Sequence, residues 1–342
     1  MFAFLDRNKK KLPEEIARGL HEVRSQSDVL VVCPSSTGFS WLGVEEATKS
    51  LFPESTFCIP HYYSNPLLTD SQLEQLAIVI NELGFSQVIF SGFLPYYYLV
   101  IKNLNTTVKV LYHGTLSELA QNEKQQDALM SLLCDEKSEK IRAIGCVQKG
   151  LAFTLSKLYG KKTYEIILPN REIRDFKYKE SQEINIGVLV NQSFLKNVHN
   201  QIAAALLVEK AVVHTFQTKD LLYLSQDRIV YHELMSHHDF LQILSEMTIN
   251  LHVTMCESWG QVLSESISLG VPCISADTSA FFDYNLDLKK RLVVSRGDDS
   301  WFIYQKINEV LKDLNSIGQE CVEYAKFLNV LSKERLDDFL NS

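Results

Sequence analysis

Residues 249–272 read INLHVTMCESWGQVLSESISLGVP, and this stretch holds one complete strand–loop–helix unit. The apolar run at 249–253 predicts a buried strand, and the apolar spacing of 261–269 predicts a helix. Gly270 and Pro272 then precede another short apolar run at 273–275. Strands and helices that alternate in this way are typical of a parallel sheet covered by helices on both faces.

The same alternation runs along most of the chain. Short runs rich in Val and Ile predict buried strands at 28–33, 56–59, 87–90, 108–112, 143–147 and 164–168. Longer runs with helical spacing predict helices at 14–25, 43–51, 71–83, 120–134 and 149–158. After a polar stretch the alternation restarts, with strands at 184–190, 211–216, 228–232, 249–253, 273–275 and 292–294. Helices are predicted among these strands at 197–210, 240–247 and 261–269, and 299–340 is almost entirely helical in pattern.

These two series of alternating strands and helices predict two similar α/β domains, each with a Rossmann-like, doubly wound parallel sheet. We expect an N-terminal domain at 1–170, a linker at 171–183, a C-terminal domain at 184–318 and a final helix at 319–342. Ligands of open α/β sheets bind at the carboxyl ends of the strands. The expected ligand site is therefore a cleft between the two sheets.

Composition and charge exclude several classes of protein. The formal net charge of the 342 residues is −8, whereas general nucleic-acid binding requires a basic surface. The longest uncharged apolar runs are shorter than the roughly 20 residues of a membrane span, and the N-terminus lacks the order of a secretory signal. The seven dispersed cysteines include no Cys-x-x-Cys. We therefore expect a cytoplasmic protein with reduced thiols, no metal and no nucleic-acid partner.

The loop at 254–260 carries the most informative chemistry. Ser258, Trp259 and Gly260 are predicted to present unpaired backbone amides at a helix start, where the helix dipole favours an anion. Glu257 and Glu265 flank these amides, and carboxylates accept hydrogen bonds from hydroxyl groups. A ligand with both phosphates and hydroxyls, such as a nucleotide sugar, suits this arrangement. Alternatively, Glu257 caps the helix and Glu265 is a solvated surface acid.

This pattern resembles the retaining glycosyltransferases of GT-B fold that carry a Glu-x(7)-Glu motif. The match covers Glu257, Ser258, Gly260, Glu265, Gly270 and Pro272, with Trp259 in place of the common Phe. The resemblance implies that Glu265 holds the ribose of the donor and that Glu257 lies beside the donor sugar. It also implies that the final helix returns to the first domain.

Weaker matches extend the resemblance along the chain. His113, followed by Gly114, matches a histidine that faces the donor sugar in this family, and 168–170 matches the turn that leads into the second domain. Lys196 falls on the family's phosphate-binding Lys. Asn191 stands where the family has Arg, which removes a permanently charged, bidentate donor. Arg171 is an additional candidate cation.

The remaining candidates are less specific. Tyr231 and His232 are predicted to follow a strand where the family binds the nucleobase. His232, His237 and His238 lack the Cys or carboxylate that would complete a zinc site. The family's glycine-rich loop is absent after the expected first strand at 1–6, and 34–43 is an alternative acceptor-side loop. The aromatic run at 93–99 is expected to pack in the core, or alternatively to meet a sugar or lipid headgroups.

The resemblance implies an enzyme that transfers a sugar from a UDP- or GDP-sugar to a hydroxyl of a glycan or lipid-linked acceptor, with retention of configuration and without a required metal. An alternative location is the inner face of the membrane, contacted by the basic residues at 7–11. Two alternatives to transfer stay open. One is a catalytically degenerate module that binds a nucleotide, a glycan or a partner transferase, and the other is a nucleotide-sugar epimerase.

Overall fold

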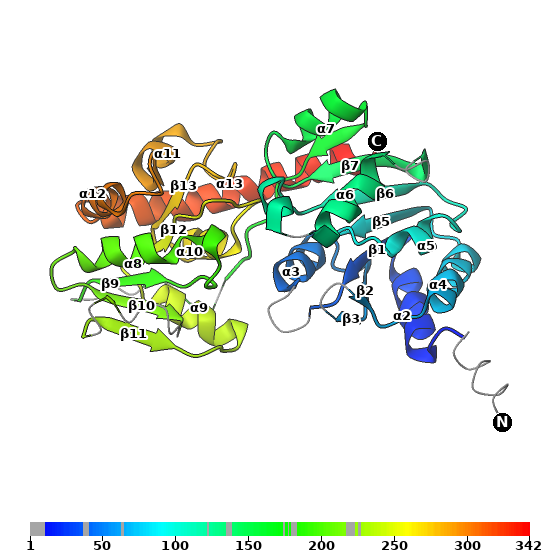
Figure 1. Ribbon diagram of the computed structural model, residues 1–342, viewed down its shortest axis with the longest axis horizontal. Helices are drawn as coiled ribbons and strands as arrows, with labels where there is room; N and C mark the ends of the chain where they lie inside the picture. The colour runs from blue at the N-terminus through cyan, green and yellow to red at the C-terminus, as the bar shows by residue number, and fades with distance from the viewer. Residues whose placement is uncertain are drawn as a thin grey trace. The chain divides into compact units, whose positions relative to one another are not determined.

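The computed structural model describes residues 11–36, 41–62, 65–121, 123–134, 139–173, 175–176, 178, 183–216, 223–224 and 227–342. The chain divides into two compact units, Met1–Pro169 with Ser332–Ser342, and Asn170–Leu331 (Figure 1). The strand expected at 1–6, most of the basic run and part of the loop at 34–43 lie outside the described residues.

The first unit contains a six-stranded sheet, and all of its strand pairs are parallel. Its strands are β1 (Val29–Pro34), β2 (Thr56–Ile59), β5 (Gln87–Ser91), β6 (Val108–Tyr112), β7 (Ile141–Cys146) and β8 (Thr163–Glu165), in the order β2-β1-β5-β6-β7-β8. The flanking helices are α2 (Glu14–Gln26), α3 (Leu42–Leu51), α4 (Asp70–Leu83), α5 (Tyr97–Ile101), α6 (Glu123–Cys134) and α7 (Leu151–Tyr159). All five residues of β6 are buried, as expected for a strand covered on both faces. The short strands β3 (His61–Tyr62) and β4 (Asn65–Pro66) form an antiparallel hairpin outside the sheet, and η1 (Ser117–Gln121) precedes α6.

The second unit repeats this plan with a second six-stranded parallel sheet. Its strands are β9 (Asn185–Val188), β10 (Val212–Phe216), β11 (Ile229–His232), β12 (Ile249–His252), β13 (Cys273–Ala276) and β14 (Val293–Val294). Their order is β11-β10-β9-β12-β13-β14, which is the Rossmann order 3-2-1-4-5-6 when β9 is numbered first. The helical elements are η3 (Phe194–Lys196), α8 (Val198–Leu206), α9 (His237–Ser245), α10 (Gln261–Leu269), α11 (Leu286–Leu292), α12 (Ser300–Val310) and α13 (Leu314–Leu340). The predicted class, two Rossmann-like parallel-sheet domains, is confirmed.

Several predicted boundaries were wrong by a few residues, for identifiable reasons. Helix α9 begins at His237, not at 240, because the Ser236 side chain accepts the Asp239 amide and caps the helix three residues earlier. Helix α8 ends at Leu206, well before 210. Lys210 has a left-handed φ of 61°, which a continuing helix does not allow.

Helix α13 begins in the second unit, and its residues from Ser332 onward belong to the first. Within the first unit, the Lys109 ammonium donates to the carbonyls of Phe339 and Leu340, each at 2.7 Å. A cation at a helix C-terminus is stabilised by the unpaired carbonyls and by the helix dipole. Ser332 adds a hydrogen bond to the Ile167 carbonyl at 2.6 Å. Among the described residues, no helix combines the length and apolar character that a membrane span requires.

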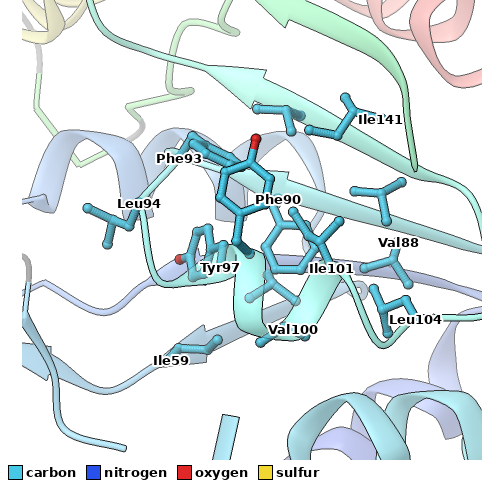
Figure 2. Close-up of a cluster of buried hydrophobic side chains, with 14 of the residues drawn as sticks. Ile59, Val88, Phe90, Phe93, Leu94, Tyr97, Val100, Ile101, Leu104 and Ile141 are labelled. Carbon is cyan, nitrogen blue, oxygen red and sulfur yellow. The ribbon is translucent and has the colours of Figure 1, made fainter. Parts of the chain in front are cut away.

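Most of the aromatic run at 93–99, whose last three residues begin α5, lies in the core of the first unit. Figure 2 shows Phe90, Phe93 and Tyr97 within one cluster of buried side chains. The rings of Phe90 and Tyr97 are 4.8 Å apart between centroids, and Tyr97 is completely buried. The expectation of core packing is confirmed for Phe93 and Tyr97, whose buried rings are not available to stack on a sugar or on lipid.

We expect Tyr97→Ala to lower the free energy of unfolding by about 3–5 kcal/mol, because it leaves a cavity among these rings. Urea denaturation of the two proteins measures the loss. Tyr159→Ala, at the exposed end of α7, is the matched control and should cost far less. Equal losses in the two variants would contradict this description of the core.

Candidate functional site

The candidate site lies at the carboxyl ends of β9 and β12. These two strands pair side by side, and the strand order of the second sheet reverses between them. Loops at such a switch point of a parallel sheet are where ligands bind. Lys196 ends the short helix η3 after β9, and Glu257 lies in the loop after β12. The Met255 amide donates to the Leu195 carbonyl at 2.8 Å and joins the two loops.

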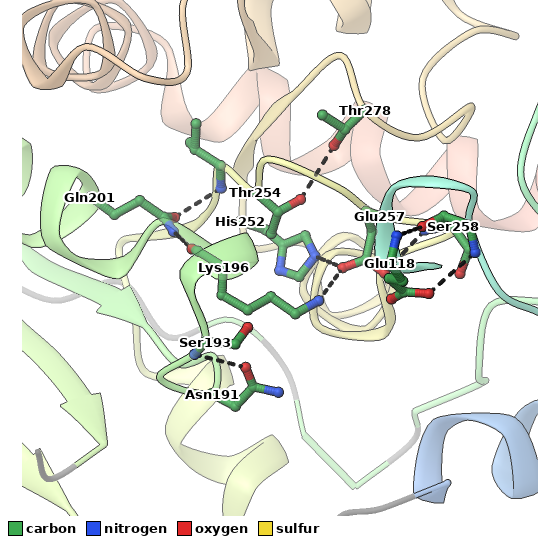
Figure 3. Close-up of polar contacts among 12 residues, drawn as sticks. Glu118, Asn191, Ser193, Lys196, Gln201, His252, Thr254, Glu257, Ser258 and Thr278 are labelled. Atoms are coloured by element: carbon green, nitrogen blue, oxygen red, sulfur yellow. Dashed lines mark hydrogen bonds and ion pairs between the residues drawn. The ribbon is translucent and has the colours of Figure 1, made fainter. Parts of the chain in front are cut away.

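Lys196, Glu257 and His252 form a compact charged cluster (Figure 3). The Lys196 ammonium lies 2.6 Å from Glu257 Oε2, and His252 Nε2 lies 3.0 Å from the same oxygen. His252 is the last residue of β12 and is only 4% exposed. Lys196 and Glu257 were candidates from the sequence but His252 was not; its signal is a polar residue at the carboxyl end of a buried strand.

These contacts hold the Glu257 carboxylate in its charged form. Burial alone would raise the pKa of Glu257, but the hydrogen bond from His252 and the charge of Lys196 outweigh it and lower the pKa to about 2. The Ser258 amide also donates to Glu257 Oε1, at 3.2 Å. The carboxyl group therefore interacts with both side chains and backbone, and the alternative that it caps α10 is wrong, because Gly260 is the N-cap residue.

Two amide side chains fix the loop that carries Lys196. Asn197 has a left-handed φ of 53°, and its Nδ2 donates to the carbonyls of Val253 at 3.0 Å and Gly297 at 2.6 Å. Gln201 donates to the Lys196 carbonyl at 2.7 Å and accepts the Val253 amide at 2.8 Å. Both side chains are buried, so the backbone on either side of Lys196 is held against the end of β12. Neither residue was predicted from the sequence.

Asn191 lies in the exposed loop between β9 and η3. Its Oδ1 accepts the Ser193 amide at 3.3 Å, which is a local turn contact (Figure 3). The position thus carries an uncharged side chain that shapes its own loop.

The structure corrects the expected anion-binding amides. Helix α10 begins at Gln261 with Gly260 as its N-cap, so the amides without an intrahelical partner are those of 260–263, and of the three expected residues only Gly260 is among them. Trp259 is only 2% exposed, and its ring packs against Phe281 at 5.1 Å between centroids, so only its backbone faces the loop. Gly260 has a φ of 93°, and a Cβ there would lie 3.1 Å from His252 Nε2. Glycine therefore permits the close approach of this turn to His252.

Glu265 belongs to a second cluster with His237 and Arg171. It is 7% exposed within α10, so the alternative of a solvated surface acid is wrong. His237 Nε2 lies 2.7 Å from Glu265 Oε1, and Arg171 Nη1 lies 2.9 Å from His237 Nδ1. Because Arg171 is a donor only, His237 accepts at Nδ1 and donates from Nε2 to the carboxylate. Sequence analysis named Arg171 and His237 without finding this connection.

Tyr231 and His232 lie within β11 and do not follow it, contrary to the expectation. His232 stacks on His214 of the neighbouring β10, with 3.0 Å between His232 Nε2 and His214 Nδ1. Burial lowers the pKa of both rings, and with the charge of His232 it brings that of His214 to about 4. The described residues contain no group of three or more His, Cys, Asp or Glu side chains arranged to hold a metal.

His113 belongs to the first unit and directly follows β6. Its Nε2 lies 3.0 Å from the Ser91 hydroxyl, which also contacts the Thr48 hydroxyl at 2.6 Å. Burial lowers the pKa of His113 to about 4. The imidazole is therefore neutral near pH 7, where it serves as a hydrogen-bonding group and carries no positive charge.

No family model and no curated protein matches this sequence. Solved structures do match. Anabaena Alr3699/HepE in complex with UDP and glucose is 13% identical with a TM-score of 0.64, over 92% of this chain and 100% of that one. Sucrose-phosphate synthase from Thermosynechococcus elongatus is 13% identical with a TM-score of 0.63, over 91% and 98% of the two chains. This chain has the GT-B fold. WaaG, a glycosyltransferase involved in lipopolysaccharide biosynthesis, is also similar, at 12% identity and a TM-score of 0.62 over 90% of this chain and 98% of that one.

The low pKa of Glu257 links its contacts to stability. The carboxyl group titrates near 4.5 when unfolded and near 2 when folded, so its stabilisation is complete above pH 4.5 and is lost as the pH falls toward 2. We expect Glu257→Gln to be less stable than the wild type by up to about 3 kcal/mol at pH 7. The difference should shrink by about 2 kcal/mol at pH 3.

Chemical denaturation of both proteins across this pH range measures the difference. Glu323→Gln is the matched control, because Glu323 forms an exposed ion pair with Lys326 on the same unit. A stability difference for Glu257→Gln that does not change with pH would show that the carboxylate is not held by these contacts.

Proposed function

We propose that this protein is a retaining glycosyltransferase that moves a sugar from a nucleoside-diphosphate sugar to a hydroxyl group of a glycan or lipid-linked acceptor. The cluster of Lys196, Glu257 and His252 at the switch point of a Rossmann-ordered sheet supports this proposal most directly. Cations and carboxylates placed together suit a ligand that carries both phosphates and hydroxyls. The GT-B fold and the complex of HepE with UDP and glucose add support at the level of the fold.

In this proposal the donor pyrophosphate binds near Lys196 and the first-turn amides of α10. When the bond between the anomeric carbon and the β-phosphate oxygen breaks, negative charge grows on the departing diphosphate. A fixed ammonium and the positive end of a helix dipole stabilise that charge where it develops. The acceptor oxygen bonds to the same carbon, and the leaving phosphate takes the acceptor proton. No side chain has to act as a strong base.

The ion pair of Lys196 with Glu257 implies an order of events in donor binding, in which Lys196 must leave Glu257 before Glu257 can bind the sugar. Without a donor, the Lys196 ammonium is held by Glu257 at 2.6 Å. A pyrophosphate carries more charge than the carboxylate and competes for the same ammonium. When Lys196 turns to the phosphate, Glu257 keeps its contacts with His252 and with the Ser258 amide, and the place that the ammonium leaves at Oε2 can take a sugar hydroxyl. Phosphate binding thus prepares the contact that recognises the sugar.

Glu265 is proposed to accept the ribose hydroxyls of the donor, with His237 and Arg171 fixing its orientation. A carboxylate whose rotamer is set by a neighbouring donor binds a ligand with less loss of conformational freedom. Tyr231 and His232 stay candidates for the nucleobase, and His113 stays a candidate for contact with the donor sugar. We further propose that the protein works in the cytoplasm, where nucleotide sugars serve as donors, with the inner face of the membrane as an alternative.

A second candidate is a module that binds a nucleotide or a glycan without turnover. Asn191 favours it, because a side chain without charge stands where an Arg would stabilise the leaving group. Binding without transfer would support this second candidate. Formation of a new sugar product in the absence of any acceptor would instead indicate an epimerase.

We expect a nucleoside diphosphate or its sugar to raise the melting temperature, because a ligand that binds only the folded state stabilises it by about 2.7 kcal/mol at one hundred times its Kd. A thermal-shift series with UDP, GDP, UDP-glucose and GDP-mannose measures this effect. Glu265→Ala should remove most of the gain, whereas Glu309→Ala, in an exposed ion pair of the same unit, should keep it. The proposal is wrong if no nucleotide shifts the wild-type protein.

We expect Lys196→Met to lower kcat for sugar transfer by about 10²-fold or more, since one fixed donor to a developing anion typically contributes that much. The assay uses the donor that gives the largest thermal shift and a panel of saccharide acceptors, and NMR of the product identifies the anomer. Lys326→Met removes an exposed lysine of the same unit and should retain full activity. Unchanged kcat in Lys196→Met would exclude Lys196 from this role, and an inverted product would exclude retention.

A further inference from the structure

Two cysteines face each other at the edge of the first sheet. Cys33 of β1 and Cys58 of β2 are direct partners in the parallel register, and their sulfur atoms lie 3.5 Å apart. Strand β2 is the last strand on its side of the sheet. Cys33 is completely buried, whereas Cys58 is partly exposed, so a small reagent reaches the pair from the side of Cys58.

A carboxylate and an ammonium lie next to the partly exposed thiol. Cys58 Sγ donates to Glu45 Oε1 at 3.7 Å, and the Lys49 ammonium pairs with the same carboxylate. The second oxygen of Glu45 accepts the Ser36 amide, in the loop that follows β1. Glu45 is buried, so the thiol pair and the start of this loop belong to one hydrogen-bond network.

The environment makes the two thiols unequal. The hydrogen bond with Cys33 lowers the pKa of Cys58, and the same contact together with burial raises the pKa of Cys33. Thiolate forms first at Cys58, which is also the more exposed of the two, and the thiolate is the nucleophilic form of cysteine. Cys58 is thus the sulfur that reacts first with a reagent from solution, and Cys33 is the neighbour that reacts second.

We propose that Cys33 and Cys58 are an oxidant-sensitive pair that forms a reversible disulfide on reaction with a peroxide. The Cys58 thiolate attacks one peroxide oxygen, the O–O bond breaks, and Cys58 becomes a sulfenic acid as water leaves. The Cys33 sulfur then attacks the Cys58 sulfur, the S–O bond breaks, and a second water leaves. In sum, two thiols and one hydrogen peroxide give one disulfide and two waters.

The strand geometry allows this bond and makes it reversible. Neighbouring strands lie about 4.8 Å apart, within the Cα separations of about 4.4–6.8 Å at which disulfides form. The sulfur atoms lie 3.5 Å apart and must approach to about 2.05 Å in a disulfide, so the two side chains have to move toward each other. Disulfides formed against such resistance are readily reduced by small thiols, as a regulatory bond must be in a reducing compartment.

The other described thiols, Cys146, Cys256, Cys273 and Cys321, are all buried, whereas Cys58 is partly exposed. Burial raises the pKa of Cys146 to about 12 and raises those of Cys273 and Cys321 as well, and all three side chains are buried. Oxidation therefore selects the Cys33–Cys58 pair. The bond also removes the S–H donor from Glu45, which holds the start of the loop after β1 through Ser36.

The experiment treats the reduced 342-residue chain with one equivalent of hydrogen peroxide, alkylates the remaining thiols with iodoacetamide and then digests the chain with trypsin. Cleavage after Arg24, Lys49 and Lys102 releases residues 25–49 and 50–102, each with one of the two cysteines. Mass spectrometry is expected to find these two peptides joined in most chains, and separate again after treatment with dithiothreitol. Separate, fully alkylated peptides under conditions that oxidise other thiols would overturn the proposal, as would a disulfide between any other pair.

Two variants test the assigned order of reaction. Cys33→Ala is expected to stop at a sulfenic acid on Cys58 that dimedone captures, whereas Cys58→Ala should leave Cys33 unmodified at the same dose. Capture at Cys33 in the second variant would overturn the order. Because the wild-type peptide map decides the main question alone, the proposal stays testable even where a variant at the buried position fails to fold.

Discussion

Parallel strand pairing is the constraint on which the candidate site depends. In the second sheet it brings the carboxyl ends of β9 and β12 to the same edge, although Lys196 and Glu257 are 61 residues apart in sequence. The strand order reverses between these two strands, which is the point of an open α/β sheet where ligands generally bind. Charged side chains have access to solvent at that point without disrupting the apolar layers on either face.

The charged cluster is stable because its members compensate one another. A carboxylate as enclosed as that of Glu257 would be costly alone, and an isolated buried group of this kind would take up a proton. Lys196 and His252 both contact one of its oxygens, and Asn197 and Gln201 hold the backbone that carries the lysine. The backbone clamp matters as much as the charges, because a long lysine side chain loses considerable entropy when it is held in one position.

The sequence predicted the elements well and their ends less well, for a physical reason. Each strand of a parallel sheet is buried on both faces and therefore appears as an apolar run, so the order of strands and helices was clear. The ends of helices depend on capping contacts of single side chains. Ser236 caps α9 three residues before the predicted start, whereas α10 begins at Gln261 as predicted, with Gly260 as its N-cap residue.

The candidate site was predictable only where it follows a local spacing. Glu257 and Glu265 lie eight residues apart, and that separation is visible in the sequence. The contacts of His252, Asn197 and Gln201 could not be predicted from sequence spacing, because they depend on which strands pair and in which register.

The uncharged side chain of Asn191 determines how much positive charge the candidate site carries. Without an Arg there, the ligand-free loop carries one cation, Lys196, and that cation is already neutralised by Glu257. Under the proposed function, a donor has to compete with the Glu257 carboxylate for this ammonium. The exchange of partners at Lys196, more than the number of positive charges, would then set donor affinity.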